Sequence, residues 1–303
     1  MEENINKYNK PKSGAGLTVA LIIAAVVIVA LVGVLIVGTV YNVNRGLSFW
    51  GGTSNYTYSG AASYTSSGEF SVSAADISDI NVDWIAGNIT VTICDGEEIK
   101  VSEINDSNDP NDMMRYKVDR GTLIIKFRNS GRFISTNFRK DLIVEIPKDI
   151  AASLGLDIEA VSADIDINTS GEAVEMNFGS INIDTVSGHA CICDVNASSV
   201  DVNTVSGDTI LSGKIANMDI DTVSGNVSVD VRTNPKELDV VTVSGDVNIK
   251  VPDDPNKTVI DTVSGEVNVN GVKTKRSYEA ENPSCSGNID IDTVSGDVTI
   301  TSK

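Results

Sequence analysis

Six copies of the tetrapeptide Thr-Val-Ser-Gly constrain this chain more than any other feature. Their glycines are residues 188, 207, 225, 245, 265 and 296, at intervals of 19, 18, 20, 20 and 31 residues. Repetition at about 20 residues is typical of folds in which one short unit stacks on the next. Two degenerate copies precede them, Trp84–Gly87 and Ala160–Ala163, and the second ends in alanine instead of glycine.

Alignment on the glycine shows the period of two that marks a strand with one buried face. The residue five before the glycine and the residue four after it are aliphatic in every copy: Ile183, Val202, Ile220, Val240, Ile260 and Ile291 before it, and Ile192, Leu211, Val229, Ile249, Val269 and Ile300 after it. The valine two before the glycine is three residues from the preceding aliphatic position. We therefore expect a bulge or corner there that keeps the valine inside, with glycine supplying the backbone freedom.

These units predict an all-β fold. One unit of about 20 residues cannot bury its own apolar face, so we expect a β-solenoid of two-strand coils over residues 148–303. A β-sandwich of consecutive hairpins is the alternative. Residues 76–147 are less regular, with strands expected at 89–93, 123–127 and 142–146, and we expect them to form an irregular β cap that closes the sheet edge.

The N-terminal part of the chain predicts a membrane anchor. No charged residue lies between Lys12 and Arg45, and residues 17–41 are almost wholly apolar and long enough to span a bilayer. Lysines at 7, 10 and 12 predict that the tail of residues 1–16 is cytoplasmic. We therefore expect an uncleaved signal anchor in contact with membrane lipid, in a single-pass cell-membrane protein whose C-terminal domain is extracytoplasmic.

Residues 42–75 are rich in Ser, Gly, Thr, Asn and Tyr and lack hydrophobic periodicity over most of their length. Such a composition predicts a flexible linker. The alternative is an aromatic recognition segment that uses Tyr56, Tyr58 and Tyr64.

The net charge of −19 argues against a nucleic-acid partner. In-register stacking would place acidic residues in columns with rungs about 4.8 Å apart. One column contains Asp184, Asn203, Asp221, Asp261 and Asp292, and another contains His189, Asp208, Asn226, Asp246, Glu266 and Asp297. We expect no resident cofactor. Weak Ca²⁺ binding by Asp208, Asp246, Glu266 and Asp297 is one interpretation, and a solvated face screened by salt is the other.

The sequence His189-Ala190-Cys191-Ile192-Cys193 is the one cluster with metal-ligand chemistry. Its first and last ligands would lie about 13 Å apart on an extended strand, which is too far for one ion. We expect no metal site and no catalytic centre here. Because Cys191 and Cys193 lie at the limit of disulfide span, we expect all four cysteines to be free.

Basic residues gather in the expected cap. Residues 115–140 hold eight Lys or Arg and one acid, whereas residues 141–303 hold ten basic and 28 acidic residues. A contact with anionic wall polymer or lipid headgroups is one interpretation, and charge balance is the other. The candidate contact residues are Arg115, Lys117, Arg128, Arg132, Arg139 and Lys140. The insertion with Lys273, Lys275 and Arg276 is a second candidate contact loop.

The sequence Val144-Glu145-Ile146-Pro147, followed by aliphatic alternation and T-V-S-G-D-V repeats, resembles the bacterial putative-adhesin family, a domain of unknown function built of β-strand repeats. The resemblance covers residues 76–302. It implies a bacterial envelope protein, often with one membrane span, and it brings no catalytic residues.

Three functions are compatible with these observations. The first is a non-catalytic envelope module for binding, adhesion or scaffolding, with cell-wall polymer or another envelope protein as its partner. The second is an accessory or sensory protein for envelope stress. The third is a polysaccharide-active enzyme, which scarce aromatic residues and evenly recurring acids disfavour.

Overall fold

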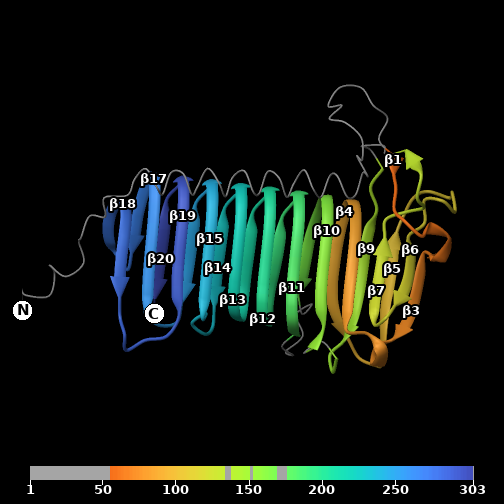
Figure 1. Ribbon diagram of the computed structural model, residues 1–303, viewed down its shortest axis with the longest axis horizontal. Coiled ribbons are helices and arrows are strands. Elements are labelled where there is room, and N and C mark those ends of the chain that lie inside the picture. The colour runs from red at the N-terminus through yellow and green to blue at the C-terminus, as the bar shows by residue number, and fades with distance from the viewer. Residues whose placement is uncertain (1–54, 134–137, 151–152, 169–175, 303) are drawn as a thin grey trace, which may run out of the picture.

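Parallel strands with identical register form most of the molecule. The computed structural model describes residues 55–133, 138–150, 153–168 and 176–302, and Figure 1 shows them as one elongated stack. The strands are β1 Asn55–Tyr56, β2 Thr65–Ser66, β3 Glu69–Ser73, β4 Asp79–Cys94, β5 Glu98–Ile104, β6 Arg115–Asp119, β7 Thr122–Lys126, β8 Arg132–Phe133, β9 Asp141–Pro147, β10 Gly155–Asn168, β11 Met176–Ser187, β12 Ala190–Ser206, β13 Thr209–Ser224, β14 Val227–Val231, β15 Glu237–Ser244, β16 Val247–Val251, β17 Lys257–Val269, β18 Val272–Glu281, β19 Asn288–Ser295 and β20 Val298–Ser302.

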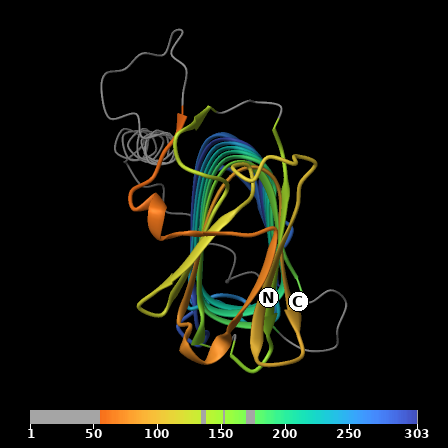
Figure 2. The ribbon, with the colours of Figure 1, turned by 90° about the vertical axis from the view of Figure 1, so that its right-hand side faces the viewer.

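Each repeat contributes one strand segment to each of two facing walls. Segments that precede a corner glycine pair with one another in parallel and form the first wall, through β4, β10, β11, β12, β13, β15, β19 and β17. Segments that follow the glycine form the second wall. Viewed along the stack, the coils nest into a flattened tube (Figure 2). The prediction of an all-β fold made of stacked repeats is confirmed.

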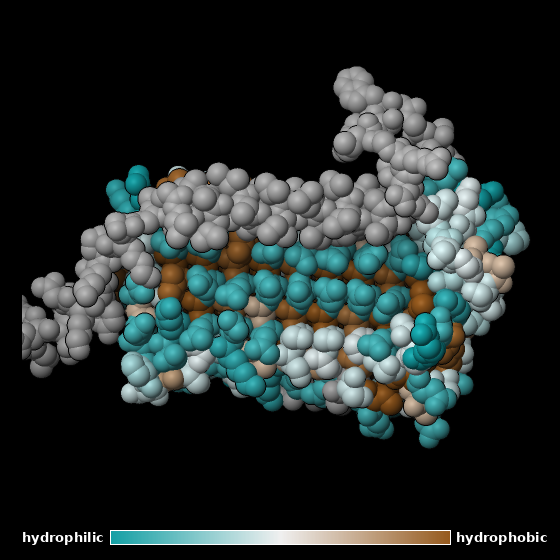
Figure 3. Space-filling model, viewed as in Figure 1, coloured by the Kyte–Doolittle hydropathy of each residue, from teal (hydrophilic) through white to brown (hydrophobic). Residues whose placement is uncertain are grey.

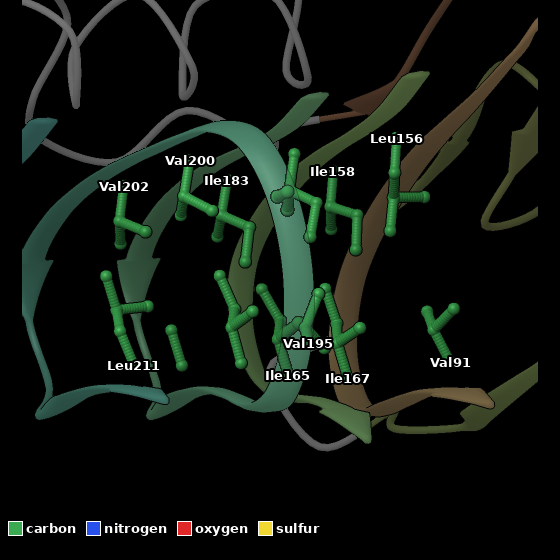
Figure 4. Close-up of a cluster of buried hydrophobic side chains, with 14 of the residues drawn as sticks. Val91, Leu156, Ile158, Ile165, Ile167, Ile183, Val195, Val200, Val202 and Leu211 are labelled. Carbon is green, nitrogen blue, oxygen red and sulfur yellow. The ribbon is translucent and has the colours of Figure 1, made fainter. Parts of the chain in front are cut away.

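Aliphatic side chains from both walls fill the tube. Ile158, Ile183 and Val202 come from the first wall, Ile167 and Leu211 from the second, and all five are buried. Figure 4 shows these side chains directed between the walls, in rows that follow the stack. This arrangement confirms that the positions five before and four after the glycine face the core.

At the corner, the side chain that faces inward is the threonine of the repeat, and not the valine that we expected. The threonine of the repeat is buried in all six copies, whereas Val186 is half-buried and Val263 is exposed. The alternation of the strand therefore continues for one more step, from the aliphatic residue to the threonine, before the chain turns. Five of these threonines, Thr204, Thr222, Thr242, Thr262 and Thr293, have a buried hydroxyl with no hydrogen-bond partner in the described part of the chain.

The glycine itself is required at the corner. Gly207 has a φ of 142°, in the region that side chains oppose. A Cβ atom built on it would lie 1.9 Å from the carbonyl oxygen of Gly188 in the adjacent coil. The corner glycines therefore allow both the turn and the close contact between successive coils.

Shorter strands of mixed direction cover one end of the tube. On the first wall, β7 pairs with β4, β6 with β7, and β2 with β6. On the second wall, β9 pairs with β4, β5 with β9, and β3 with β5. Strands β7 and β9 run parallel to β4, and the direction then alternates, so that each wall continues into antiparallel strands at the N-terminal side.

The order of coils at the other end differs from the order in the sequence. The last repeat, β19–β20, pairs on one side with β15 and β16 and on the other side with β17. It is thus inserted between the two repeats that precede it. The insertion near residue 270 is not a loop, because it forms strand β18, which pairs antiparallel with β17 and ends the stack (Figure 1).

The prediction of a flexible linker is wrong from residue 55 onward. The Tyr56 side chain is buried, and its hydroxyl accepts a hydrogen bond from the backbone N–H of Phe127 at 3.2 Å. Tyr58 packs between Tyr56 and Tyr64, with ring centroids 5.5 and 5.1 Å away. Aromatic burial stabilises this segment against the cap, although its composition resembles that of a linker.

The predicted cytoplasmic tail, the apolar segment 17–41 and the start of the linker lie outside the described residues. Among the residues that the structure does describe, no helix has the length and apolar character needed to cross a membrane.

Candidate binding face

Two adjacent columns of acidic and amide side chains run along the outer face of the first wall. They occupy the positions six and four before the corner glycine, which alternate with buried aliphatic residues. The pairing registers align the first column as Asn81, Asp157, Asn182, Asp201, Asp219, Asp239, Asp290 and Val259, and the second as Asp83, Glu159, Asp184, Asn203, Asp221, Val241, Asp292 and Asp261. We call these two columns the acidic face.

Figure 3 shows hydrophilic residues in rows along the stack, separated by hydrophobic ones. The predicted column through Asp184, Asp221 and Asp292 is confirmed, with Val241 interrupting it. The sequence analysis did not predict the other column of the acidic face, which lies six residues before the corner glycine. The alternation in Asp219-Ile220-Asp221 and Asp290-Ile291-Asp292 contained the signal for it, since both aspartates alternate with aliphatic residues.

Crowding changes the ionisation of the acidic face. Partial burial, and then repulsion by neighbouring carboxylates, raise the pKa of Asp221, Asp239 and Asp292 to about 6. Burial likewise raises the pKa of Asp184 and Asp219. The cause is general, because removing water and adding like charges both disfavour the ionised form.

The raised pKa values predict that stability falls as the pH rises. The folded protein binds protons at Asp221, Asp239 and Asp292 up to a pKa of about 6, whereas unfolded aspartates titrate near 3.9. The native state therefore holds more protons between these values, and the free energy of unfolding should be larger at pH 4.5 than at pH 7.5. Urea unfolding at several pH values measures this. Changing all three to Asn should flatten the dependence, whereas Asp253→Asn in the exposed loop after β16 should leave it unchanged.

A third acidic column follows directly after the corner glycines, and its carboxylates have structural partners. The backbone N–H of Asn226 donates to Asp208 Oδ1 at 2.8 Å, that of Asp297 donates to Asp246 Oδ1 at 2.9 Å, and that of Glu266 donates to Asp297 Oδ1 at 2.8 Å. Each side chain thus accepts a hydrogen bond from the adjacent coil. Such bonds to ionised acceptors stabilise the stack.

This column contains the four residues of the calcium interpretation. The order of coils brings Asp246 next to Asp297, and Asp297 next to Glu266. In the described part of the chain, no three acidic, histidine or cysteine side chains converge as ligands would. Weak calcium binding stays a prediction.

The six basic candidates do not form a common contact surface. Arg128 is buried and pairs with Asp112 at 3.3 Å. Arg132 pairs with Asp109 at 2.6 Å, and Lys117 with Asp119 at 3.1 Å. An Arg115 guanidinium nitrogen donates to the carbonyl of Pro110 at 2.9 Å, and Arg139 is exposed.

Lys140 is part of the cap core. Its side chain is 0% exposed, forms an ion pair with Glu103 and donates to the backbone carbonyl of Asp112 at 2.9 Å. The ammonium lies 4.9 Å from the centre of the Trp84 ring and 4.7 Å from that of Phe127. Burial lowers its pKa to about 8. Burial removes Arg128 and Lys140 from any contact surface, whereas partner contact through Arg115, Lys117, Arg132 and Arg139 stays a prediction.

The cysteine prediction is half correct. Cys94 and Cys285 are free, but Cys191 and Cys193 form a disulfide, with their Cα atoms 5.6 Å apart. The expectation assumed a straight strand. The Cα separation lies within the usual range for a disulfide. Strand β12 is irregular next to the disulfide, with a register shift between Ile192 and Val195 and a positive φ of 59° at Asp194.

Several solved structures are similar to this chain. A crystal structure of a putative adhesin from Bacteroides fragilis is 13% identical, covers 77% of this chain and 96% of its own, and has a TM-score of 0.48. A putative cell adhesion protein from Clostridium sporogenes is 17% identical, with coverages of 79% and 100% and a TM-score of 0.34. A putative lipid binding protein from Parabacteroides distasonis is 11% identical, with coverages of 77% and 96% and a TM-score of 0.37. No curated protein matches the sequence.

The repeat region also matches one family model along nearly its whole length. The match runs over residues 77–301, from the start of β4 to the end of β20. It therefore includes most of the cap, every T-V-S-G corner and strand β18. The chain belongs to the Toastrack DUF4097 family.

Proposed function

We propose that this protein is a non-catalytic binding module of the bacterial envelope that presents its acidic face to a cationic segment of a partner. The observation that carries the proposal is the pair of carboxylate columns on a rigid wall, in which Asp219, Asp221 and Asp239 are neighbours. Their spacing is fixed by the sheet, so the face is preorganised for a partner with repeated positive charges.

Membrane anchoring belongs to the same proposal. Segment 17–41 would hold the protein in the cell membrane as a single-pass protein, with residues 1–16 in the cytoplasm and the stack outside. The adhesion and binding roles named for similar structures agree with such a display of a rigid surface. The sensory role stays a prediction that depends on the N-terminal tail. The acidic residues recur evenly along the wall and form no unique cluster there, so they do not support the enzyme alternative.

Binding of a fluorescent decalysine peptide tests the acidic face. We expect the full-length protein in detergent to bind the peptide in fluorescence anisotropy, and the affinity to fall with added salt. Changing Asp219, Asp221 and Asp239 to Asn should weaken binding roughly tenfold, because three solvent-accessible ion pairs of up to about 1 kcal/mol each are lost.

A matched control separates the acidic face from net charge. The variant Glu97→Gln, Asp230→Asn and Asp253→Asn removes three acidic groups at the cap, the second wall and a loop. This variant should bind almost as tightly as the natural protein. Equal loss in both variants, or no binding by the natural protein, would refute the proposal.

A further inference from the structure

The valines of the T-V-S-G corner form an apolar row on the outer side of the first wall. Each follows an inward-facing residue, which is threonine in the T-V-S-G copies, so the alternation of the strand turns the valine outward. The registers of the flanking residues align valines of consecutive coils, all of them half-buried: Val161, Val186, Val205, Val223, Val243 and Val294. We call this row the valine ridge.

The fold does not require an apolar residue at this position. The other outward positions of the wall, six and four before the glycine, mostly carry Asp or Asn. Threonine has the same branched shape as valine and is equally suited to a strand. Valine nevertheless occupies the position in every T-V-S-G copy. A contiguous apolar row at the surface is typical of a site that another molecule covers.

The valine ridge borders the acidic face. The outward residue before each valine is the one four before the glycine, so Asp221 precedes Val223 on the same strand. Outward neighbours on a strand are about 6.6–6.8 Å apart, and the ridge and this acidic column therefore run side by side along the stack. On the other side of the ridge come the exposed serines of the repeat and then the third acidic column. The ridge is thus an apolar row between two negatively charged ones.

A basic amphipathic α-helix is complementary to this pattern. Its apolar stripe can lie on the ridge, while Lys and Arg beside the stripe extend to carboxylates such as Asp219 and Asp221. An extended strand cannot do both, because the residues on one of its faces form a single line. The carboxylates also disfavour an anionic lipid surface. Five intervals of about 4.8 Å give the ridge a length of about 24 Å, which equals a helix of about 16 residues.

We propose that the valine ridge and the acidic face together bind a basic amphipathic helix of a partner protein, which lies along the stack. This inference rests on the proposed function, because it names the kind of cationic segment that the acidic face receives. Solvent-accessible ion pairs are weak and screened by salt, whereas burial of an apolar stripe holds the helix in one rotation about its axis. Part of the affinity should therefore persist at high salt, unlike that of decalysine.

Three substitutions of equal shape test the ridge. The variant Val205→Thr, Val223→Thr and Val243→Thr keeps the branched side chains and every carboxylate. The probe is a fluorescent peptide of about 16 residues whose leucines form one stripe on a helix, with lysines beside it. Full-length protein in detergent should bind this striped peptide, and the variant should bind it at least about fivefold more weakly. One detergent concentration for all proteins keeps peptide loss to micelles equal.

Decalysine distinguishes the ridge from the acidic face. It has no apolar stripe, so the threonine variant should bind it as tightly as the natural protein does, which also shows that the variant is folded. The variant with Asn at residues 219, 221 and 239 should bind both peptides more weakly, because both use the carboxylates.

A matched control removes apolar side chains from other surfaces. The variant Val118→Thr, Ile210→Thr and Val272→Thr changes exposed residues of the cap, the second wall and strand β18. It should bind both peptides like the natural protein. Equal loss of striped-peptide binding in this control would show that the ridge is not the apolar site.

The results separate this inference from the proposed function. If the natural protein and the variant with threonine on the ridge bind the striped peptide equally, the ridge takes no part and the inference is wrong. Weaker decalysine binding by the Asn variant would still support the acidic face in that case. If decalysine does not bind the natural protein, the proposed function fails, and this inference fails with it.

A fluorophore on the ridge tests for other occupants. An environment-sensitive maleimide dye on Val223→Cys, in a chain with Cys94→Ser and Cys285→Ser to remove the free thiols, should shift its emission to the blue when the striped peptide is added. A dye that is already shifted and does not respond to the peptide would mean that residues 17–41 or a second copy covers the ridge, which would overturn the proposal. Sedimentation velocity distinguishes these two occupants, since only a second copy increases the mass.

Discussion

Gly207→Ala should destabilise the stack by about 3 kcal/mol or more, which is at the upper end of the range for single substitutions. The added Cβ atom would lie 1.9 Å from the carbonyl oxygen of Gly188, and 2.6 Å from its carbonyl carbon. That oxygen belongs to the backbone of a coil that is itself paired on both sides, so it cannot move away without breaking ladder hydrogen bonds. Urea unfolding followed by circular dichroism measures the loss.

Gly96→Ala provides the matched control. Gly96 has a φ of 119°, so alanine is strained there too, but nothing lies within 4 Å of the position that the new methyl group would take. We expect a cost of about 1–2 kcal/mol for the backbone conformation alone. If the two variants lost equal stability, contact between coils would not be the reason for glycine at the corner.

Lys140→Met should cost about 3–5 kcal/mol, because it leaves the Glu103 carboxylate buried without its cation. Glu103 would keep the hydrogen bond from the backbone N–H of Met114, at 3.0 Å. The indole N–H of Trp84 donates to the Lys140 carbonyl at 2.9 Å, so tryptophan fluorescence reports on this part of the cap.

The double variant Lys140→Met with Glu103→Leu should recover much of this loss. Buried ion pairs are often replaceable by apolar groups of similar size, whereas breaking them by removing one member is expensive. A double-mutant cycle measures the coupling. A double variant that loses as much as the sum of the two single variants would show that the two charges do not depend on each other.

Local repetition made the main part of the fold predictable. Ile183 and Ile192 face the core because the strand period of two is encoded in each copy, and the glycine corner follows from conformational preference. The inward threonine could also have been read from that period. The prediction favoured Val186 only because valine is more apolar.

Long-range pairing explains what the sequence could not reveal. Every T-V-S-G coil offers the same edge, so nothing in the repeats says that β19 lies between β15 and β17. The partners of Lys140 and Arg128 are also distant in the sequence, and a charge count cannot identify them. The acidic face was half predictable, since its columns depend on the repeat while its raised pKa values depend on burial by neighbouring coils.

The inserted position of the last repeat has a consequence for how the protein is made. Coils from β4 to β16 can add to the cap one after another as the chain emerges, because each pairs with a coil already synthesised. Strand β17 must wait, since its native neighbours β19 and β20 are residues 288–302. During that interval the free edge of β15 is open to β17, which carries the same repeat. The end of the molecule that is farthest from the cap is therefore completed only after residues 288–302 have been synthesised.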